Sequence, residues 1–201
     1  MSNSPLVNYT KLSPNYSQRT HKIEAITIHH MASNLSVEVC GAGFAMPSRK
    51  ASSNYVIGTD GRVGLYVDES NRSWCSDSRD NDDRAITIEV ANDSREPDWD
   101  VSDTALAKLI ELCADICKRN NIEYLNYTGD ETGNLTMHCW FATTGCPGPF
   151  LKEKFVYIAN EVNRRLGALD KVIEEKDPKF KIGVHYANTS SILATAALST
   201  T

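Results

Sequence analysis

Two short segments with one alternating pattern place a histidine and a glutamate among apolar side chains. The segment ITIHH, residues 26–30, and the segment AITIEVA, residues 85–91, both alternate apolar and polar residues. This alternation predicts β-strands, because successive side chains of a strand point to opposite faces. His29 and Glu89 each follow a threonine by two residues. Pairing in that register would therefore bring both side chains to one polar face of a sheet.

Glu89 stands out within its segment because it is a carboxylate in an apolar strand. Burying a carboxylate without a partner is costly, and such residues concentrate at functional sites. We therefore expect a functional role for Glu89. The first strand is expected to begin at Ile23, after a polar approach without predicted structure.

Residues 51–67 contain the clearest hairpin signal in the chain. The stretches SNYVIG and VGLYV are joined by Thr59-Asp60-Gly61-Arg62, in which Asp-Gly supplies the positive φ of a tight turn. The polar residues 68–84 that follow predict a loop. This loop is a candidate rim for a substrate site.

Two amphipathic helices are predicted further along the chain. Apolar residues recur at helical spacing over residues 105–117, behind Ser102 as an N-cap. A second periodic run covers residues 151–166 and stops at Gly167. Between them, residues 134–149 are too rich in Gly, Pro and Thr for a helix. A loop bearing His and Cys therefore lies between two helices.

Strands interspersed with long helices predict an α/β fold, in which a mixed central β-sheet is flanked by helices. We expect residues 1–167 to form one domain, a length that can bury a sizeable core. Residues 168–201 mix charge with a Ser/Thr/Ala-rich end, and we expect a linker or a poorly ordered tail there.

The charge balance and the absence of long apolar runs limit the classes of partner. With 21 basic and 26 acidic side chains, the formal net charge is −5, which argues against nucleic acid as a partner. No apolar run is long enough for a membrane span, and residues 1–20 contain no signal-peptide core. We expect synthesis in the cytoplasm and no membrane insertion. The oligomeric state is left open.

The six cysteines of the chain are expected to remain reduced, because a chain of this size without a secretion signal does not need disulfides. Cys113 and Cys117 lie four residues apart on the first predicted helix. We interpret both as small core residues rather than as a disulfide or a second metal site.

Three further residues are of types that bind zinc: His29, His138 and Cys146. A catalytic zinc takes three protein ligands and keeps a fourth position open. Strand parity favours His29 over His30, which shares a face with the isoleucines. Taken singly, His138 is better interpreted as a hydrogen-bonded structural histidine, and Cys146 as a buried inert thiol.

These residues resemble the type 2 N-acetylmuramoyl-L-alanine amidases, a family that includes phage endolysins and shares its fold with peptidoglycan recognition proteins. The resemblance covers roughly residues 20–166. It is carried by ITIHHMAS at 26–33, SSNYVIGTDGRVGLYVDE at 52–69, AITIEVAND at 85–93 and HCWFATTGCPGPF at 138–150. A pair of histidines alone is weak, whereas its combination with H-x7-C-P-G after a long helix is specific.

The resemblance implies hydrolysis of the amide bond between N-acetylmuramic acid and L-alanine in bacterial peptidoglycan. It implies a Zn²⁺ ion held by His29, His138 and Cys146, which would polarise the scissile carbonyl and lower the pKa of bound water. Glu89 matches a strand glutamate that serves as general base in bacterial members of the family.

Two positions depart from the commonest pattern of the family. Ser53 stands where many members have a tyrosine, and Thr144 stands where several have a lysine. Those side chains help to stabilise the developing oxyanion elsewhere in the family. Here we expect Thr144 to donate one hydrogen bond in that role.

Substrate contacts are predicted for residues expected to line the cleft. Tryptophan stacks on a sugar or peptide face, and arginine pairs with a peptide carboxylate. For each residue, an ordinary surface or packing role is an equal alternative. The residues are His30, Asn54, Trp74, Arg79 and Trp140.

Two readings from other classes compete with the enzyme. A non-catalytic peptidoglycan-binding module can share this fold, but such modules usually lack the cysteine ligand, and Cys146 is present. A zinc-stabilised interaction domain needs a fourth protein ligand, for which Cys139 is the candidate. For the enzyme, we expect a phage endolysin that acts on the cell wall after its release. A host autolysin or recycling enzyme is the alternative.

Overall fold

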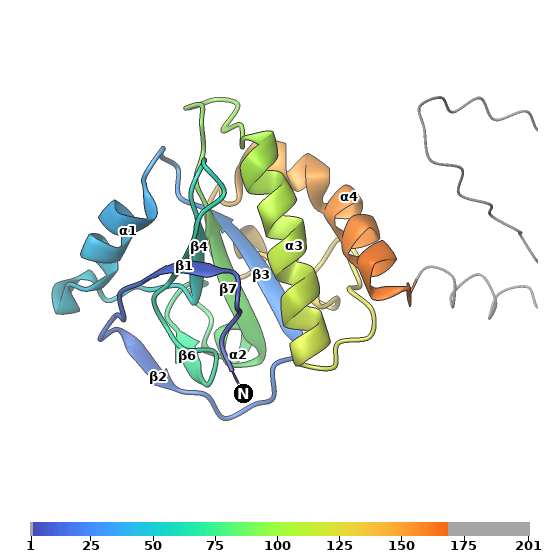
Figure 1. Ribbon diagram of the computed structural model, residues 1–201, viewed down its shortest axis with the longest axis horizontal. Coiled ribbons are helices and arrows are strands. Elements are labelled where there is room, and N and C mark those ends of the chain that lie inside the picture. The colour runs from blue at the N-terminus through green and yellow to red at the C-terminus, as the bar shows by residue number, and fades with distance from the viewer. Residues whose placement is uncertain (1, 169–201) are drawn as a thin grey trace, which may run out of the picture. The chain divides into compact units, whose positions relative to one another are not determined.

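A six-stranded mixed sheet lies at the centre of the part of the chain that the structure describes, residues 2–168 (Figure 1). In this computed structural model the strand order is β1-β5-β4-β7-β3-β8. The β4 and β5 strands run antiparallel, and the other neighbours run parallel. The strands are β1 (Val7–Thr10), β3 (Ala25–His30), β4 (Tyr55–Ile57), β5 (Val63–Leu65), β7 (Ala85–Val90) and β8 (Leu135–Met137).

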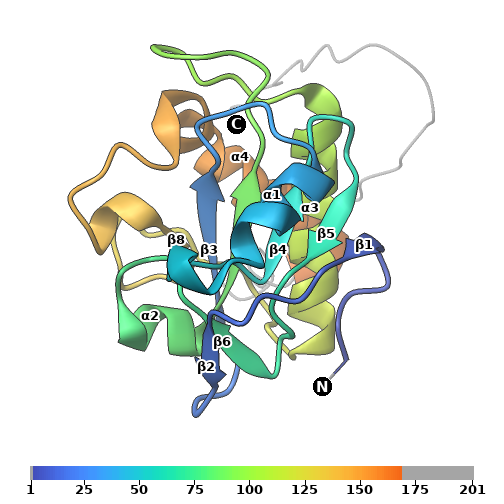
Figure 2. The same cartoon turned by 90° about the vertical axis from the view of Figure 1, so that its left-hand side faces the viewer.

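The helices lie on both sides of this sheet, as the alternation of strands and helices predicts (Figures 1 and 2). The predicted tail, residues 168–201, lies outside the described residues except for Ala168. No helix among the described residues is long and apolar enough to span a bilayer. The helices are α1 (Val37–Phe44), α2 (Arg79–Arg84), α3 (Asp103–Arg119) and α4 (Gly148–Leu166), with short 3-10 turns at Pro47–Arg49 and His138–Trp140.

The two long helices α3 and α4 cover one face of the sheet and enclose the main core. Both have the ends that the sequence predicts. Ser102 caps α3 by accepting a hydrogen bond from the backbone of Ala105, and Gly167 ends α4 at a φ of 67°. Cys113 and Cys117 are buried in this core, and all six cysteines are free thiols, as predicted.

The central strands β3 and β7 are parallel neighbours in the register that their sequences indicate. His29 pairs with Glu89 and Thr27 with Thr87, whereas the isoleucines of both strands belong to the core under α3 and α4. Side chains at paired positions of neighbouring strands share a face. His29 and Glu89 therefore lie side by side on the face opposite the long helices, and the parity prediction is confirmed.

The opposite face of the sheet carries α1 and the segment that contains α2 (Figure 2). Helix α1 packs Val37, Cys40 and Phe44 against Val56 and Tyr66. Gly41 permits this approach, because a Cβ there would lie 2.7 Å from the Tyr66 ring. Helix α1 thus forms a wall on the face that bears His29 and Glu89.

Several short elements differ from the sequence-based prediction. The approach to β3 contains β1 and also β2 (Tyr16–Gln18), which pairs antiparallel with β6 (Asn71–Ser73). Residues 68–84, predicted as a loop, contain β6 and α2, and residues 134–149 contain β8. Each of these strands is three or four residues long and is defined by its partner rather than by its own alternation.

Candidate metal centre and active-site cleft

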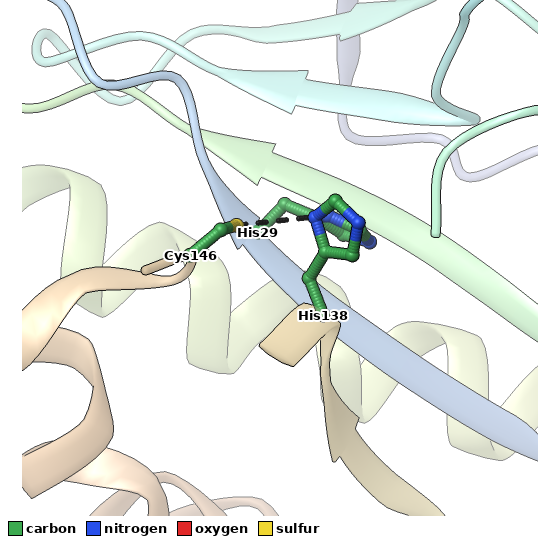
Figure 3. A group of neighbouring side chains, drawn as sticks. All are labelled: His29, His138 and Cys146. Carbon is green, nitrogen blue, oxygen red and sulfur yellow. Dashed lines mark hydrogen bonds between the residues drawn. The ribbon is translucent and has the colours of Figure 1, made fainter. Parts of the chain in front are cut away.

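The parallel pairing of β3 with β8 brings the first two predicted metal ligands together (Figure 3). Ile28 pairs with Met137, so the next residues, His29 and His138, are neighbours at the ends of their strands. Their rings lie 4.6 Å apart between centroids. His29 and His138 are 109 residues apart in sequence, and the register of the two strands is sufficient to make them neighbours.

Cys146 completes the group from the loop that leads into α4 (Figure 3). Its Sγ accepts a hydrogen bond from the backbone N–H of His30 at 3.3 Å and lies 3.8 Å from Nδ1 of His29. One ligand atom each of His29, His138 and Cys146 lies within 4.8 Å of the others. The structure thus brings together all three residues predicted to bind a metal.

Burial sets the protonation of this group. It lowers the pKa of His29 well below the ordinary value, with smaller contributions from His138 and His30. Burial likewise lowers the pKa of His138. Both imidazoles are therefore neutral at neutral pH, and a neutral imidazole offers a nitrogen lone pair to a cation.

Glu89 lies in a cleft of about 530 Å³ that Cys146 and His138 also line. Its Oε1 accepts a weak hydrogen bond from the Cys75 thiol at 3.8 Å, and its Oε2 is buried without a partner among residues 2–168. Burial raises the pKa of the Glu89 carboxyl to about 8, against opposing effects of Cys75 and of the Arg49 charge. An unpartnered buried carboxylate oxygen beside the His–His–Cys group marks this cleft as a reactive site.

Thr144 and Ser53, the two positions that depart from the family pattern, lie in different environments. Thr144 lines the cleft, and its Oγ1 accepts the N–H of Cys146 at 3.2 Å, so its own proton remains free to donate. Ser53 is fully buried and bonds to Tyr55 and Thr87. Ser53 therefore belongs to the packing between β4 and β7 and not to the cleft.

Three of the predicted substrate-contact residues lie near the metal ligands. His30 and Trp74 line the cleft, and the Trp74 indole donates to Ser17 at 2.8 Å. A second hollow of about 450 Å³ continues past Trp74 and His138, and the exposed Arg79 lines it. The two hollows share Trp74, Cys75 and His138, so they adjoin beside the metal ligands.

Two predicted substrate contacts lie elsewhere. Asn54 is fully buried, donates to the backbone of Val67 and accepts from the N–H of Thr87. Trp140 stacks on Tyr127 at 6.0 Å and lines a separate hollow. Neither side chain reaches the cleft. The Asn54 amide is buried in hydrogen bonds between strands, and the Trp140 side chain packs against the main core.

The sequence analysis missed two residues of the cleft. Arg49 follows α1 and lines the cleft with an exposed side chain whose charge acts on Glu89. Cys75 contacts Glu89, and Cys75, His29 and Glu89 also have ligand atoms within 4.8 Å of one another. The sequence pattern does not indicate a functional role for either residue. The packing of α1 and β6 determines where the two segments that bear them lie.

Cys139 does not join the metal-ligand group. Its backbone N–H donates to the carbonyl of Cys146 at 3.1 Å, and its side chain packs against the main core. Within residues 2–168, the groups suited to a metal ion do not include Cys139. The reading as a closed structural zinc site therefore lacks its fourth protein ligand.

A cleft with a buried carboxylate beside two histidines and a cysteine is the kind of site that enzymes of the metal-dependent hydrolase class use. Residues 19–149 match the family described as N-acetylmuramoyl-L-alanine amidase. The match covers more than half of the chain, and the chain therefore belongs to this family of peptidoglycan amidases. The predicted family and enzyme class are confirmed.

Comparison with solved structures shows the same fold in three proteins. A mutant endolysin from Bacillus subtilis has a TM-score of 0.61 at 18% identity, covering 78% of this chain and 99% of its own. A mutant of PlyL has 0.61 at 15%, covering 77% and 96%. A selenomethionine derivative of AmpD has 0.59 at 18%, covering 79% and 99%. A search of curated proteins finds no match.

Proposed function

We propose that this protein hydrolyses the amide bond between N-acetylmuramic acid and L-alanine of peptidoglycan with the help of a zinc ion. The main observation that supports this proposal is that His29, His138 and Cys146 lie close together beside the carboxyl group of Glu89 in one cleft. Family membership supplies the reaction and the substrate.

The donor set fits zinc. In tetrahedral geometry, zinc bonds of about 2.0–2.3 Å place two ligand atoms of one ion roughly 3.3–3.8 Å apart. The ligand atoms of His29, His138 and Cys146 all lie within 4.8 Å of one another, so small rotations suffice. When bound, zinc polarises a carbonyl oxygen and lowers the pKa of water. Three protein ligands leave room for the substrate.

Glu89 acts as the general base in this proposal when its carboxyl is ionised, a form that its pKa of about 8 favours as the pH rises. Its unpartnered Oε2 accepts a proton from the attacking water and later returns one to the departing alanine nitrogen, which balances the hydrolysis. The hydroxyl group of Thr144 donates a hydrogen bond to the oxyanion that forms on the amide oxygen.

The groove beside these residues suits a muramoyl peptide. Trp74 offers an aromatic face to a sugar or peptide unit, and Arg79 and Arg49 offer guanidinium groups to the carboxylates of the stem peptide. The remaining wall is apolar, with Val39 of α1 and Leu35 just before this helix, and suits the methyl groups of the lactyl and alanine units.

Product identification tests the proposal. Purified protein is incubated with muropeptides as isolated, after chelation and after zinc is restored, and the products are identified by mass spectrometry. We expect intact disaccharide and a stem peptide with a free L-alanine amino terminus, only when zinc is present. Cys146→Ala should behave like the chelated protein. Muropeptides that are bound but uncut would instead support a non-catalytic binding module.

We also propose that the protein is made in the cytoplasm and serves in cell-wall lysis, as a phage endolysin that acts after release. The similarity of its fold to an endolysin supports this role. The rates of cleavage of intact sacculi and of soluble muropeptides, measured at equal concentrations of the scissile bond, distinguish a lytic enzyme from a recycling enzyme. Rapid solubilisation of sacculi is expected. Cleavage confined to soluble fragments would point to a recycling enzyme.

A further inference from the structure

The loop between β6 and α2 contacts both central groups of the cleft through consecutive residues. The Cys75 thiol contacts Glu89, and Oγ of Ser76 lies 3.2 Å from Nε2 of His29. Ser76 is fully buried. This hydroxyl has no place in the reaction proposed above, so its contact with a predicted metal ligand requires another explanation.

The two nitrogens of the His29 ring face different surroundings. Nδ1 lies 3.8 Å from Cys146 Sγ, on the side of the other predicted ligands, and Nε2 faces Ser76. A histidine binds a metal through an unprotonated nitrogen, and the partner of its other nitrogen decides which one carries the proton.

The hydrogen bonds around Ser76 leave its oxygen able to accept from His29. Asn81 donates from Nδ2 to Ser76 Oγ at 3.1 Å and to Thr27 Oγ1 at 2.9 Å. Ser76 Oγ therefore accepts from Asn81 through one lone pair and retains a second lone pair that can accept an N–H of His29.

The backbone around Ser76 is held by one carboxylate. Asp82 accepts the N–H of Cys75 at 2.9 Å and the N–H of Ser76 at 3.0 Å. Asp82 and Asn81 are themselves almost fully buried, in α2. The position of the Ser76 hydroxyl is thus determined by buried groups on every side.

We propose that Ser76 is a positioning residue that keeps His29 protonated at Nε2, so that Nδ1 presents its lone pair to zinc. The inference rests on the zinc-dependent function proposed above. Asn81 contributes by holding the Ser76 hydroxyl, and Asp82 by holding the Ser76 backbone. In this arrangement, a serine takes the place that a carboxylate or backbone carbonyl usually has behind a metal-binding histidine.

Zinc affinity of the full chain, measured by competition with a chromogenic chelator, tests this role. We expect Ser76→Ala to bind zinc about 10- to 100-fold more weakly than wild type, the usual effect of losing such a partner. Ser73→Ala is the matched control, because Ser73 is also fully buried and bonds to Thr87 rather than to a predicted ligand. Its zinc affinity should remain at the wild-type value.

Nitrogen-15 NMR of the histidine side chains in zinc-free wild-type protein gives a second readout that needs no substitution. We expect His29 as the Nε2-protonated tautomer, and a mixture of tautomers in Ser76→Ala. A wild-type His29 protonated at Nδ1, or an unchanged zinc affinity in Ser76→Ala, overturns the inference. If wild-type protein binds no zinc at all, the proposed function itself fails.

Discussion

The Glu89→Gln variant is expected to cleave the muramoyl–alanine amide at least about 100-fold more slowly than wild type while it retains its zinc. Glutamine preserves the size of the side chain but cannot accept the proton of the attacking water. The buried Oε2 of Glu89 has no protein partner, so the substitution removes no other hydrogen bond of that atom. Turnover with purified muropeptides and zinc content by atomic absorption provide the two measurements.

Glu123→Gln is the matched control for this experiment. Glu123 is exposed and lines a hollow away from the cleft, so turnover should remain unchanged. If Glu89→Gln retained wild-type turnover, the general-base role would be refuted. If it lost zinc instead, Glu89 would belong to the metal-ligand group that it can form with His29 and Cys75.

The long elements were predictable because their own sequences determine them. Helices α3 and α4 each combine a periodic apolar stripe with a recognisable end, at Ser102 and Gly167 respectively. The register of β3 with β7 follows from the two matching alternations, because a slip by one residue would turn the isoleucines out of the core.

Short elements outside the predicted hairpin were not predictable, because their partners lie far away in the sequence. Helix α1 has eight residues, including Gly41 and Gly43, and its packing depends on Tyr66 rather than on its own pattern. Strands such as β2 and β6 contain three residues each, too few for an alternation to be visible. Their existence depends on the pairing that the fold imposes.

The difference between local sequence patterns and long-range contacts also explains which residues of the cleft could be predicted. His29 and Glu89 could be placed together from strand parity. Residue type made His138 and Cys146 candidate ligands, and the family resemblance implied that they join His29. Asn54 was expected at the cleft because of its polarity, but its amide bonds to buried backbone groups. Ser76 gave no signal, because its importance comes from a contact across 47 residues.

The Arg19→Met variant is expected to lower the free energy of unfolding by at least about 3 kcal/mol, because several charge-assisted hydrogen bonds are lost inside the protein. Arg19 is 7% exposed, and burial lowers its pKa to about 10, so it stays charged. Urea unfolding followed by circular dichroism provides the measurement. The guanidinium group donates to five backbone carbonyls, those of Glu69, Asn71, Asp82, Asp83 and Ala85.

Methionine fills similar space but leaves these carbonyls without a donor, whereas Arg95→Met, at an exposed position, should change stability by less than about 0.5 kcal/mol. Equal stability of the two variants would contradict this account. The carbonyls flank the segment that carries Cys75 and Ser76, so Arg19 also ties that segment to the sheet. Since those two residues contact Glu89 and His29, we expect Arg19→Met to weaken zinc binding in the fraction that remains folded.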